Sequence, residues 1–303
     1  MTSDAAIQTH QLTMRFGNHT ALAPLNLSVP RGAVYALAGH NGAGKTTLLK
    51  VLLNMLRPTS GTATLLGTSS TQLDSTMFTR VGYVAEGQEM PEWMTVRAFM
   101  DYLQPFYPTW EEGSLLRDLD LPEDRRIRDL SRGMRMKLAL ASVLAFRPEL
   151  ILMDEPFSGL DPLVRDELTR TLIDRLATED GIPPTVLIST HDLAEIEPFA
   201  THAAMLHNGH LMFAEPLDIL LDRFREITVT LSDTASTSRA FPQDWMCLES
   251  SGAVVRFVHA NGSSESLPQE IRSALPSAQT IESTSIGLRE IFLAVTRTQR
   301  SAA

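Results

Sequence analysis

Apolar and polar positions alternate with a period of two near the N-terminus and change to helical spacing soon afterwards. Residues 7–29 contain two alternating stretches about a turn at Gly17, which predicts a β-hairpin. The apolar run at 33–39 predicts a buried strand that ends in glycine. The leucines that follow at helical spacing predict a helix that begins near Lys45 and stops before Pro58.

Two further short apolar runs, at 150–154 and 185–190, predict buried strands, with a helix between them over 163–178. Buried strands that alternate with helices are typical of an α/β fold whose mainly parallel sheet is covered on both faces. Between the two halves, residues 87–148 have helical patterns and little strand character. They predict an inserted helical subdomain.

The pattern changes near Arg223, which divides the chain into a predicted first domain at 1–222 and a second at 223–303. The second domain combines strand-like runs, polar turns and amphipathic helices, and we predict a small α+β domain. Its expected strands lie at 226–231 and 253–260, its polar turns at 232–240 and 260–266, and its helices near 268–275 and 288–297.

Composition narrows the class of protein. The 303 residues are 43% apolar and carry a net charge of −10 with no Lys/Arg run, which disfavours a main activity on nucleic acid. The single cysteine, Cys247, excludes an internal disulfide. The first residues lack the apolar stretch of a signal peptide, and no run of about 18 apolar residues occurs. We therefore expect a cytoplasmic protein that does not insert directly into a membrane.

The sequence GHNGAGKTT fits the phosphate-loop pattern G-x-x-x-x-G-K-S/T and lies between a predicted strand and a predicted helix. Glycines allow backbone N–H groups to surround phosphate oxygens, while the helix start and a lysine add positive charge. The alternative is an ordinary glycine-rich turn at a helix start. We predict that the loop binds the phosphates of a nucleotide and that the hydroxyl of Thr46 binds Mg²⁺. The loop residues are Gly39, His40, Asn41, Gly42, Ala43, Gly44, Lys45, Thr46 and Thr47.

Two carboxylates, Asp154 and Glu155, follow the predicted strand at 150–154. The carboxyl ends of parallel strands point toward the ligand crevice of such a sheet. Asp154 is therefore a candidate to bind Mg²⁺ through water, and Glu155 is a candidate to orient and deprotonate an attacking water. The alternative is that both carboxylates cap the following helix.

The sequence LSRGM, with Ser131 and Gly133, precedes a predicted helix that runs to about Phe146. A hydroxyl and free N–H groups at a helix start form a second anion site that needs no lysine. Taken alone, the same residues are typical of an ordinary helix N-cap.

Together with SGLD and STHD, these motifs resemble the nucleotide-binding subunit of an ATP-binding cassette (ABC) transporter over about residues 5–220. The resemblance implies a P-loop NTPase core with an antiparallel β-subdomain and an inserted helical subdomain. It further implies that Phe16 stacks on adenine, that Asp161 belongs to the loop linking two ATP sites, and that His191 contacts the γ-phosphate. The alternatives are core packing for Phe16 and a buried structural role for His191.

Two positions depart from the family's pattern. Its signature is most often LSGGQ, whereas Arg132 and Met134 stand here at the third and fifth positions. The loop that normally holds a glutamine has Glu86 at that position, with Gln88 two residues on as the alternative. Glu86 could still bind Mg²⁺ but would repel the γ-phosphate. These departures, and the sequence FYPTW at 106–110, resemble ABC-2-type bacterial exporter ATPases.

The resemblance implies an ATPase with ATP and Mg²⁺ as cofactors, which works as a head-to-tail dimer of two copies or of this chain with a related ATPase. Ser131 of one subunit would face ATP held by Lys45 of the other, and motion would pass to integral membrane permease subunits at the cytoplasmic face. The alternatives are a soluble ABC ATPase that acts on ribosomes or DNA and, more remotely, a P-loop kinase. Aromatic residues at 93–110 predict either a groove for a permease helix or the subdomain's own core.

Overall fold

The computed structural model describes residues 5–177, 183–232, 242, 245–262 and 265–302. Most of the polar turn expected at 232–240, part of the turn at 260–266 and the end of the helix expected at 163–178 lie outside these residues. The chain divides into two compact units: Met1–His191 with Pro198–Ala214, and Asp192–Glu197 with Glu215–Ala303.

An antiparallel sheet begins the first unit. Its long strand β1 pairs with β2 across the turn at Gly17, as the alternating pattern predicted, and near its start β1 lies between β3 on one side and β5 on the other. Strand β6 extends the sheet beyond β5. The strands are β1 (Ala5–Phe16), β2 (His19–Leu25), β3 (Ser28–Pro30), β5 (Ser60–Leu65) and β6 (Thr68–Ser69).

A six-stranded sheet forms the centre of the first unit, in the order β11-β10-β4-β9-β8-β7. The four pairs from β10 to β7 are parallel, which confirms the predicted mainly parallel sheet. Strands β4, β8 and β9 are buried at every position, as expected for strands covered on both faces. The strands are β4 (Val34–Ala38), β7 (Val81–Ala85), β8 (Leu150–Asp154), β9 (Thr185–Thr190), β10 (His202–His207) and β11 (His210–Pro216).

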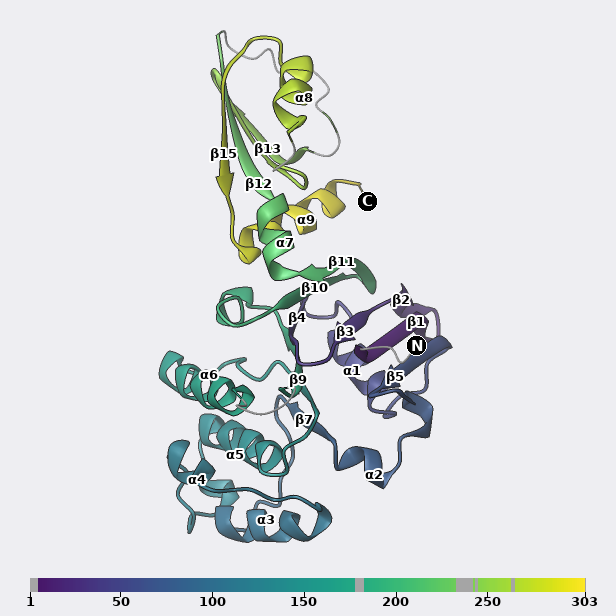
Figure 1. The fold of residues 1–303 in the computed structure, drawn as a ribbon, viewed down its shortest axis with the longest axis vertical. Helices are drawn as coiled ribbons and strands as arrows, with labels where there is room; N and C mark the ends of the chain where they lie inside the picture. The colour runs from purple at the N-terminus through teal and green to yellow at the C-terminus, as the bar shows by residue number, and fades with distance from the viewer. Residues whose placement is uncertain (1–4, 178–182, 233–241, 243–244, 263–264, 303) are drawn as a thin grey trace. The chain divides into compact units, whose positions relative to one another are not determined.

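Helices cover this sheet from both sides (Figure 1). The leucines of α1 (Lys45–Leu52) join one apolar core with both sheets, because the helix packs between them. On the other side, α5 (Arg132–Leu144) lies so close to β7 that a Cβ at Gly82 would be 2.3 Å from Val143 Cγ1. An ion pair of 2.5 Å between the buried amine of Lys137 and Glu167 links α5 to α6 (Pro162–Leu176).

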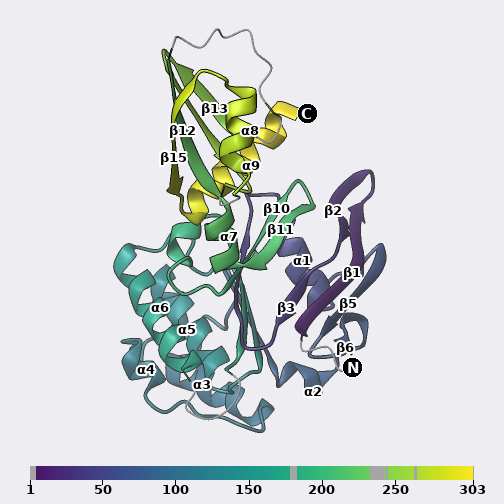
Figure 2. The same ribbon diagram turned by 45° about the horizontal axis from the view of Figure 1, so that its top comes forward.

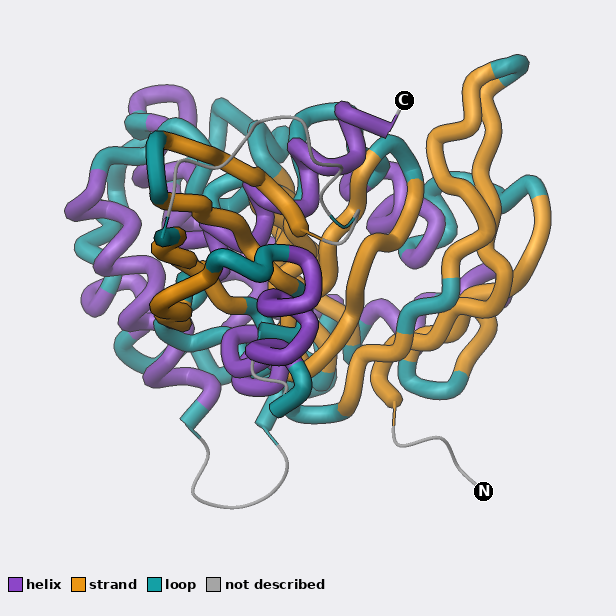
Figure 3. The backbone as a smooth tube through the Cα atoms, turned by 90° about the horizontal axis from the view of Figure 1, so that it is seen from above, coloured by secondary structure: helices purple, strands orange, loops and turns teal. Residues whose placement is uncertain are grey.

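The helical subdomain predicted at 87–148 is present and consists of α3 (Val96–Leu103), α4 (Leu115–Asp118) and α5, with short 3-10 turns at Gln104–Phe106 and Ile127–Asp129. It lies on the opposite side of the six-stranded sheet from the antiparallel sheet (Figure 2). Figure 3 shows from above that the helices of this subdomain and the strands of the antiparallel sheet lie on opposite sides. A short helix, α2 (Ser75–Phe78), precedes β7.

The second unit has its own antiparallel sheet in the order β13-β14-β12-β15. Alternate residues of β12 are buried and form a core with α8, and Trp245 stacks on Phe257 with 3.9 Å between ring centroids. The predicted strands and helices are present, and the structure adds β13 and β15. The elements are α7 (Leu217–Arg223), β12 (Arg225–Leu231), β13 (Trp245–Ser251), β14 (Val254–His259), α8 (Leu267–Ala274), β15 (Ala278–Ser285) and α9 (Leu288–Ala302).

Candidate active site

The glycine-rich loop joins the end of β4 to the start of α1. A Cβ at Gly39 would lie 2.7 Å from the carbonyl oxygen of Leu206 and 2.9 Å from the Cβ of Ala43. Gly44 has φ +110°, and a Cβ there would lie 2.6 Å from the carbonyl oxygen of Ala21. The path of the loop therefore requires glycine at both positions, and it leads directly to the helix start, whose first N–H groups have no intrahelical acceptor.

The other loop residues differ in exposure. Ala43 is buried, whereas Asn41, Gly42 and Thr46 are exposed and Thr47 is half-buried. His40 Nδ1 lies 2.7 Å from the carbonyl oxygen of Asn41. The loop therefore presents backbone and the Thr46 hydroxyl to solvent, as a phosphate-binding loop requires.

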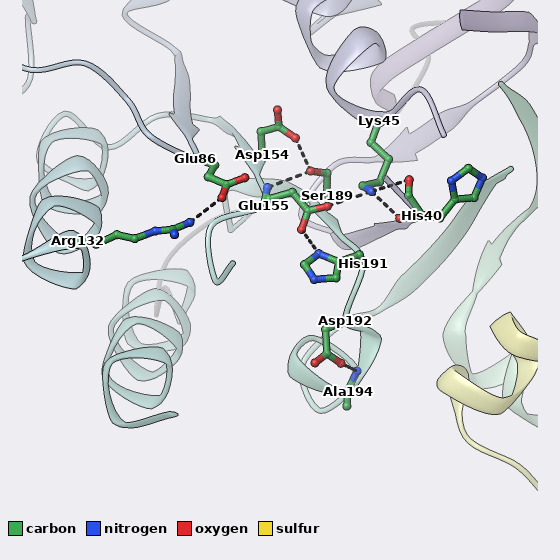
Figure 4. Close-up of polar contacts among 11 residues, drawn as sticks. His40, Lys45, Glu86, Arg132, Asp154, Glu155, Ser189, His191, Asp192 and Ala194 are labelled. Atoms are coloured by element: carbon green, nitrogen blue, oxygen red, sulfur yellow. Dashed lines mark hydrogen bonds and ion pairs between the residues drawn. The ribbon is translucent and has the colours of Figure 1, made fainter. Parts of the chain in front are cut away.

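Lys45 begins α1 and is only 5% exposed. Its Nζ donates to the carbonyl oxygens of Gly39 at 2.5 Å and His40 at 3.3 Å, and forms an ion pair of 2.9 Å with Glu155 Oε1. A buried charge is stable only when it is paired and hydrogen-bonded. The loop carbonyls and Glu155 together hold the ammonium group at the phosphate loop (Figure 4).

Asp154 is the last residue of β8 and is buried. Its Oδ1 accepts a hydrogen bond of 2.6 Å from Ser189 Oγ, which lies directly opposite on the parallel strand β9. Ser189 was not among the predicted site residues. Its position could have indicated a role at the site, because Ser189 is the first residue of the STHD motif and its strand is adjacent to β8.

Glu155 follows Asp154 in the left-handed backbone region, with φ 50°. Its N–H donates to Ser189 Oγ at 3.0 Å and to the Ser189 carbonyl oxygen at 3.2 Å, which stabilises this strained conformation. Its Oε1 contacts Lys45, and its Oε2 lies 2.7 Å from His191 Nδ1 (Figure 4). The structure therefore brings the three predicted catalytic side chains into one contiguous line.

The alternative roles for these residues do not fit the geometry. The helix after β8 is capped by Asp161 rather than by Asp154 or Glu155. The His191 side chain is 48% exposed, which excludes a buried structural role. Phe16 ends β1 and is 47% exposed, so core packing does not account for it either.

The residues proposed for Mg²⁺ are oxygen donors at the phosphate loop and at the ends of β7 and β8. Within the described residues no three His, Cys, Asp or Glu side chains form a metal cluster. A Mg²⁺ ion that is bound mainly by phosphates and water needs only one or two protein oxygens. The exposed residue Thr46 and the carboxylate of Asp154 fit this requirement.

Burial and the charge of Asp154 raise the pKa of the neighbouring Tyr83 to about 12.

The residues predicted for the second anion site and for the loop that links two ATP sites lie at two neighbouring helix starts. Ser131 Oγ accepts from Met134 N at 3.2 Å and caps α5. Asp161 Oδ1 accepts from Val164 N at 3.1 Å and caps α6. A Cβ at Gly133 would lie 3.1 Å from Val164, so glycine allows the two helix starts to approach closely. The N-cap interpretation is therefore correct for Ser131, and it leaves the N-terminal N–H groups of α5 available to an anion.

Glu86 directly follows β7, and its N–H donates to the Asp154 carbonyl oxygen at 2.9 Å. Its Oε1 forms an ion pair of 2.6 Å with Arg132, which lies on the other side of Glu86 from Lys45 (Figure 4). Gln88 Oε1 accepts from the N–H of Ala85 at 3.4 Å. The glutamine two residues on therefore folds back on its own loop, and Glu86 is the residue whose backbone is bound to Asp154.

The aromatic residues at 93–110 divide into two groups. Phe99 is buried, and Tyr107 stacks on Phe146 with 4.0 Å between ring centroids. In contrast, Trp93, Tyr102 and Phe106 are 71%, 53% and 61% exposed. The first group supports the core of the subdomain, and the second is a surface feature. No helix within the described parts of the chain has the length and apolar character needed to span a membrane.

Comparison with known proteins agrees with this geometry. Residues 22–158 match the family described as ABC transporter. Bacitracin transport ATP-binding protein BcrA of Enterococcus faecalis is 34% identical over 233 residues, which cover 75% of this chain and 75% of that protein. The protein of the same name from Bacillus licheniformis is 32% identical with the same coverage.

A solved structure described as the ATP binding subunit of an ABC transporter is 27% identical and superposes with a TM-score of 0.64, covering 71% of this chain and 91% of that one. The fold, the line of motif residues and the relatives agree with one another. The chain therefore belongs to the ABC transporter family as an ATP-binding subunit, an ATPase with the α/β P-loop NTPase fold.

Proposed function

We propose that this chain is the ATP-hydrolysing motor of a bacterial exporter and drives a separate membrane permease through ATP-dependent head-to-tail dimerisation. The observation that carries the proposal is the line of Lys45, Glu155 and His191 beside Asp154, at the mouth of the phosphate loop. Two relatives are named for bacitracin transport, which supports a role in transport. Export as the direction rests on the resemblance of the sequence motifs to exporter ATPases.

In the proposed site, the backbone of residues 39–47 and the amine of Lys45 bind the phosphates, and Phe16 stacks on adenine. Lys45 must exchange its contact with Glu155 for contacts with phosphate, which frees the Glu155 carboxylate to accept a proton from an attacking water. His191 then orients Glu155 and reaches the γ-phosphate. When bound, Mg²⁺ would neutralise phosphate charge, and Thr46 and Asp154 are the residues proposed to hold it. Glu86, the third residue predicted for Mg²⁺, is instead paired with Arg132. Catalysis is by positioning and electrostatic stabilisation.

The second half of the site is proposed to come from another copy of the chain or a related ATPase. Ser131 and Gly133 offer a capped helix start in a position exposed to solvent, and Asp161 lies in the adjacent loop. ATP held by one subunit would contact this helix start of the other. Hydrolysis would then release the two subunits.

The permease is proposed to dock on the helical subdomain at the cytoplasmic face of the membrane. A hollow of about 100 Å³ lies between the segment after β7 and α5, lined among others by Gly87, Gln88 and Arg135. The exposed aromatic side chains Trp93, Tyr102 and Phe106 belong to the same subdomain and would contact a short helix of the partner. Because the hollow adjoins the Glu86 segment, nucleotide binding and docking would influence each other.

Size-exclusion chromatography with light scattering on the Glu155→Gln variant tests this proposal. With ATP and Mg²⁺ we expect a stable dimer that does not turn over ATP, because binding remains while the proton acceptor is lost. Adding Ser131→Arg should abolish the dimer without preventing ATP binding to the monomer. ATP turnover by Glu155→Gln at the wild-type rate would contradict the role of Glu155, and an ATP-dependent dimer that survives Ser131→Arg would contradict the composite site.

A further inference from the structure

The two positions at which this chain departs from the ABC pattern contact each other. Glu86 stands where the family has glutamine, and Arg132 stands at the third position of the signature. They are 46 residues apart in sequence, yet Arg132 Nη2 lies 2.6 Å from Glu86 Oε1. Two departures from the family pattern that carry opposite charges and contact each other indicate a single ion pair with one role rather than two independent changes.

Both partners are anchored beside the hydrolytic carboxylates. The backbone N–H of Glu86 donates to the Asp154 carbonyl oxygen at 2.9 Å. This hydrogen bond fixes the backbone of Glu86 beside the end of β8. Arg132 is the first residue of α5. Its guanidinium group occupies the space that the missing side chain of Gly159 leaves, because a Cβ there would lie 2.7 Å from Nη1. The guanidinium group is thus held between the segment after β7 and the SGLD loop.

This ion pair has an electrostatic consequence for nucleotide binding. A carboxylate in place of a neutral amide beside the phosphate site repels a polyanion. An arginine at hydrogen-bonding distance neutralises that carboxylate and attracts it toward the side opposite Lys45 (Figure 4). Both side chains are about half exposed, and such pairs contribute little to folding stability. We therefore expect this ion pair to act on nucleotide binding rather than on the stability of the fold.

We propose that Arg132 is a positioning residue that neutralises Glu86 and holds it away from the phosphates, which makes glutamate at this position compatible with ATP binding. The proposal rests on the ATP-binding function proposed above. It requires that the effect of removing Arg132 depends on the presence of Glu86. A direct contact of Arg132 with phosphate would instead act whether or not Glu86 is present.

A second ion pair provides a matched control. Arg135 lies one turn further along α5, and its Nη1 is 3.0 Å from Glu92 Oε1, in the same segment after β7. This pair joins the same two parts of the chain and also has an exposed carboxylate. The backbone of Glu86 is bound to the end of β8, whereas the backbone of Glu92 is bound to Arg128 in the helical subdomain. The permease proposed to dock beside Arg135 is absent from the assay, so loss of the Arg135 charge should leave ATP binding unchanged.

The test is a double-mutant cycle on the full chain in the Glu155→Gln background, with the dissociation constant of ATP measured by calorimetry in the presence of Mg²⁺. We expect Arg132→Gln to weaken binding about fivefold, the size expected for one uncompensated charge near the site. In Glu86→Gln protein, the same Arg132→Gln change should alter the dissociation constant by less than about twofold. The fivefold loss should shrink as salt rises to about 0.5 M, because salt screens exposed charges.

The outcomes separate the possible roles. An equal loss in both backgrounds would mean that Arg132 contacts phosphate directly, and no loss in either would mean that the ion pair is irrelevant to nucleotide; both overturn the inference. A similar loss in Arg135→Gln would reduce the effect to a general loosening of α5, which also overturns it. If the parent protein binds no ATP, the proposed function itself fails.

Discussion

The two halves of the candidate ATP site are built in different ways. On the phosphate-loop side, the functional groups are bound to one another, with Lys45 on Glu155, Glu155 on His191 and Ser189 on Asp154, and all of these except His191 are largely shielded from solvent. On the signature side, Ser131 is an exposed helix cap, and the charge of Arg132 is half exposed. The first half is complete within one chain, whereas the second offers free N–H groups and charge to solvent. A site divided in this way can bind nucleotide alone but needs a second surface to complete it.

Lys45→Ala should have the largest effect, because it removes the only full positive charge on the phosphate loop. We expect ATP binding to weaken roughly 10- to 100-fold, from the loss of charge-assisted hydrogen bonds. Lys50→Ala is the matched control, since Lys50 lies on the same helix but is exposed. Calorimetry with ATP and Mg²⁺ measures both variants. If Lys50→Ala weakened binding as much as Lys45→Ala, the phosphate-loop half would not be assigned correctly.

Ser189→Ala should lower kcat for ATP hydrolysis about 10-fold, the range seen when a group that orients a metal ligand is removed. The hydroxyl binds the Asp154 carboxylate and also accepts from the Glu155 N–H, so both acidic groups lose a constraint. Steady-state ATPase kinetics test this prediction. Ser142→Ala removes another buried serine, whose hydroxyl donates to the Ala139 carbonyl oxygen of its own helix, and should leave kcat unchanged.

Ser131→Ala probes the exposed half. Loss of the N-cap should lower the free energy of unfolding by about 1 kcal/mol, and ATP binding to the single chain should be unchanged. Thr95→Ala removes the corresponding cap of α3, where Thr95 Oγ1 accepts from Ala98 N at 3.1 Å. Chemical denaturation should give similar losses for both variants, but only Ser131→Ala should reduce the ATP-dependent dimer. If the two variants dimerised equally, Ser131 would act only as a helix cap, and the proposed difference between the two halves of the site would be wrong.

Glu149→Gln should have the smallest effect and tests whether exposed ion pairs matter to the fold. The hydrogen bonds from Arg80, at 2.5 and 2.9 Å, hold the pKa of Glu149 below its ordinary value of 4.5. A carboxylate with a lowered pKa stabilises the folded state above pH 4.5, and this contribution is lost as the pH falls through the folded-state value. Because Glu149 is 44% exposed, the loss at neutral pH should stay under about 1 kcal/mol. Melting curves at a series of pH values measure it, and a destabilisation that does not decline as the pH falls below 4.5 would contradict an electrostatic cause.

The sequence was informative where one local rule determines the structure. The glycine-rich loop, the apolar runs that became β8 and β9, and the start of α1 all followed from short patterns. Strand β15 was not predicted, because most of its residues are exposed and polar and its pairing with β12 is set by the rest of the sheet. Strand β13 was missed for a similar reason, since a register shift between Met246 and Glu249 interrupts its alternation.

The contacts between distant motifs were harder to predict than the motifs themselves. Ser189 and Asp154 meet because their strands are neighbours in a given register, and no pattern in either segment states that register. In the same way, Arg132 and Glu86 each appeared only as a departure from the family, and their pairing depends on how α5 packs beside β7. Chemistry could be read from residue types, while geometry required the fold.

The lysines of this chain have a practical consequence. The sequence contains three, of which Lys45 and Lys137 are buried against carboxylates and Lys50 is exposed. A reagent that acylates amines should therefore modify Lys50 readily and Lys45 only when its contact with Glu155 opens. Mass spectrometry of the acylated peptides would then report whether the phosphate loop is occupied, in protein that carries no substitution and no attached probe. Lys50, on the same helix, would serve as the internal standard.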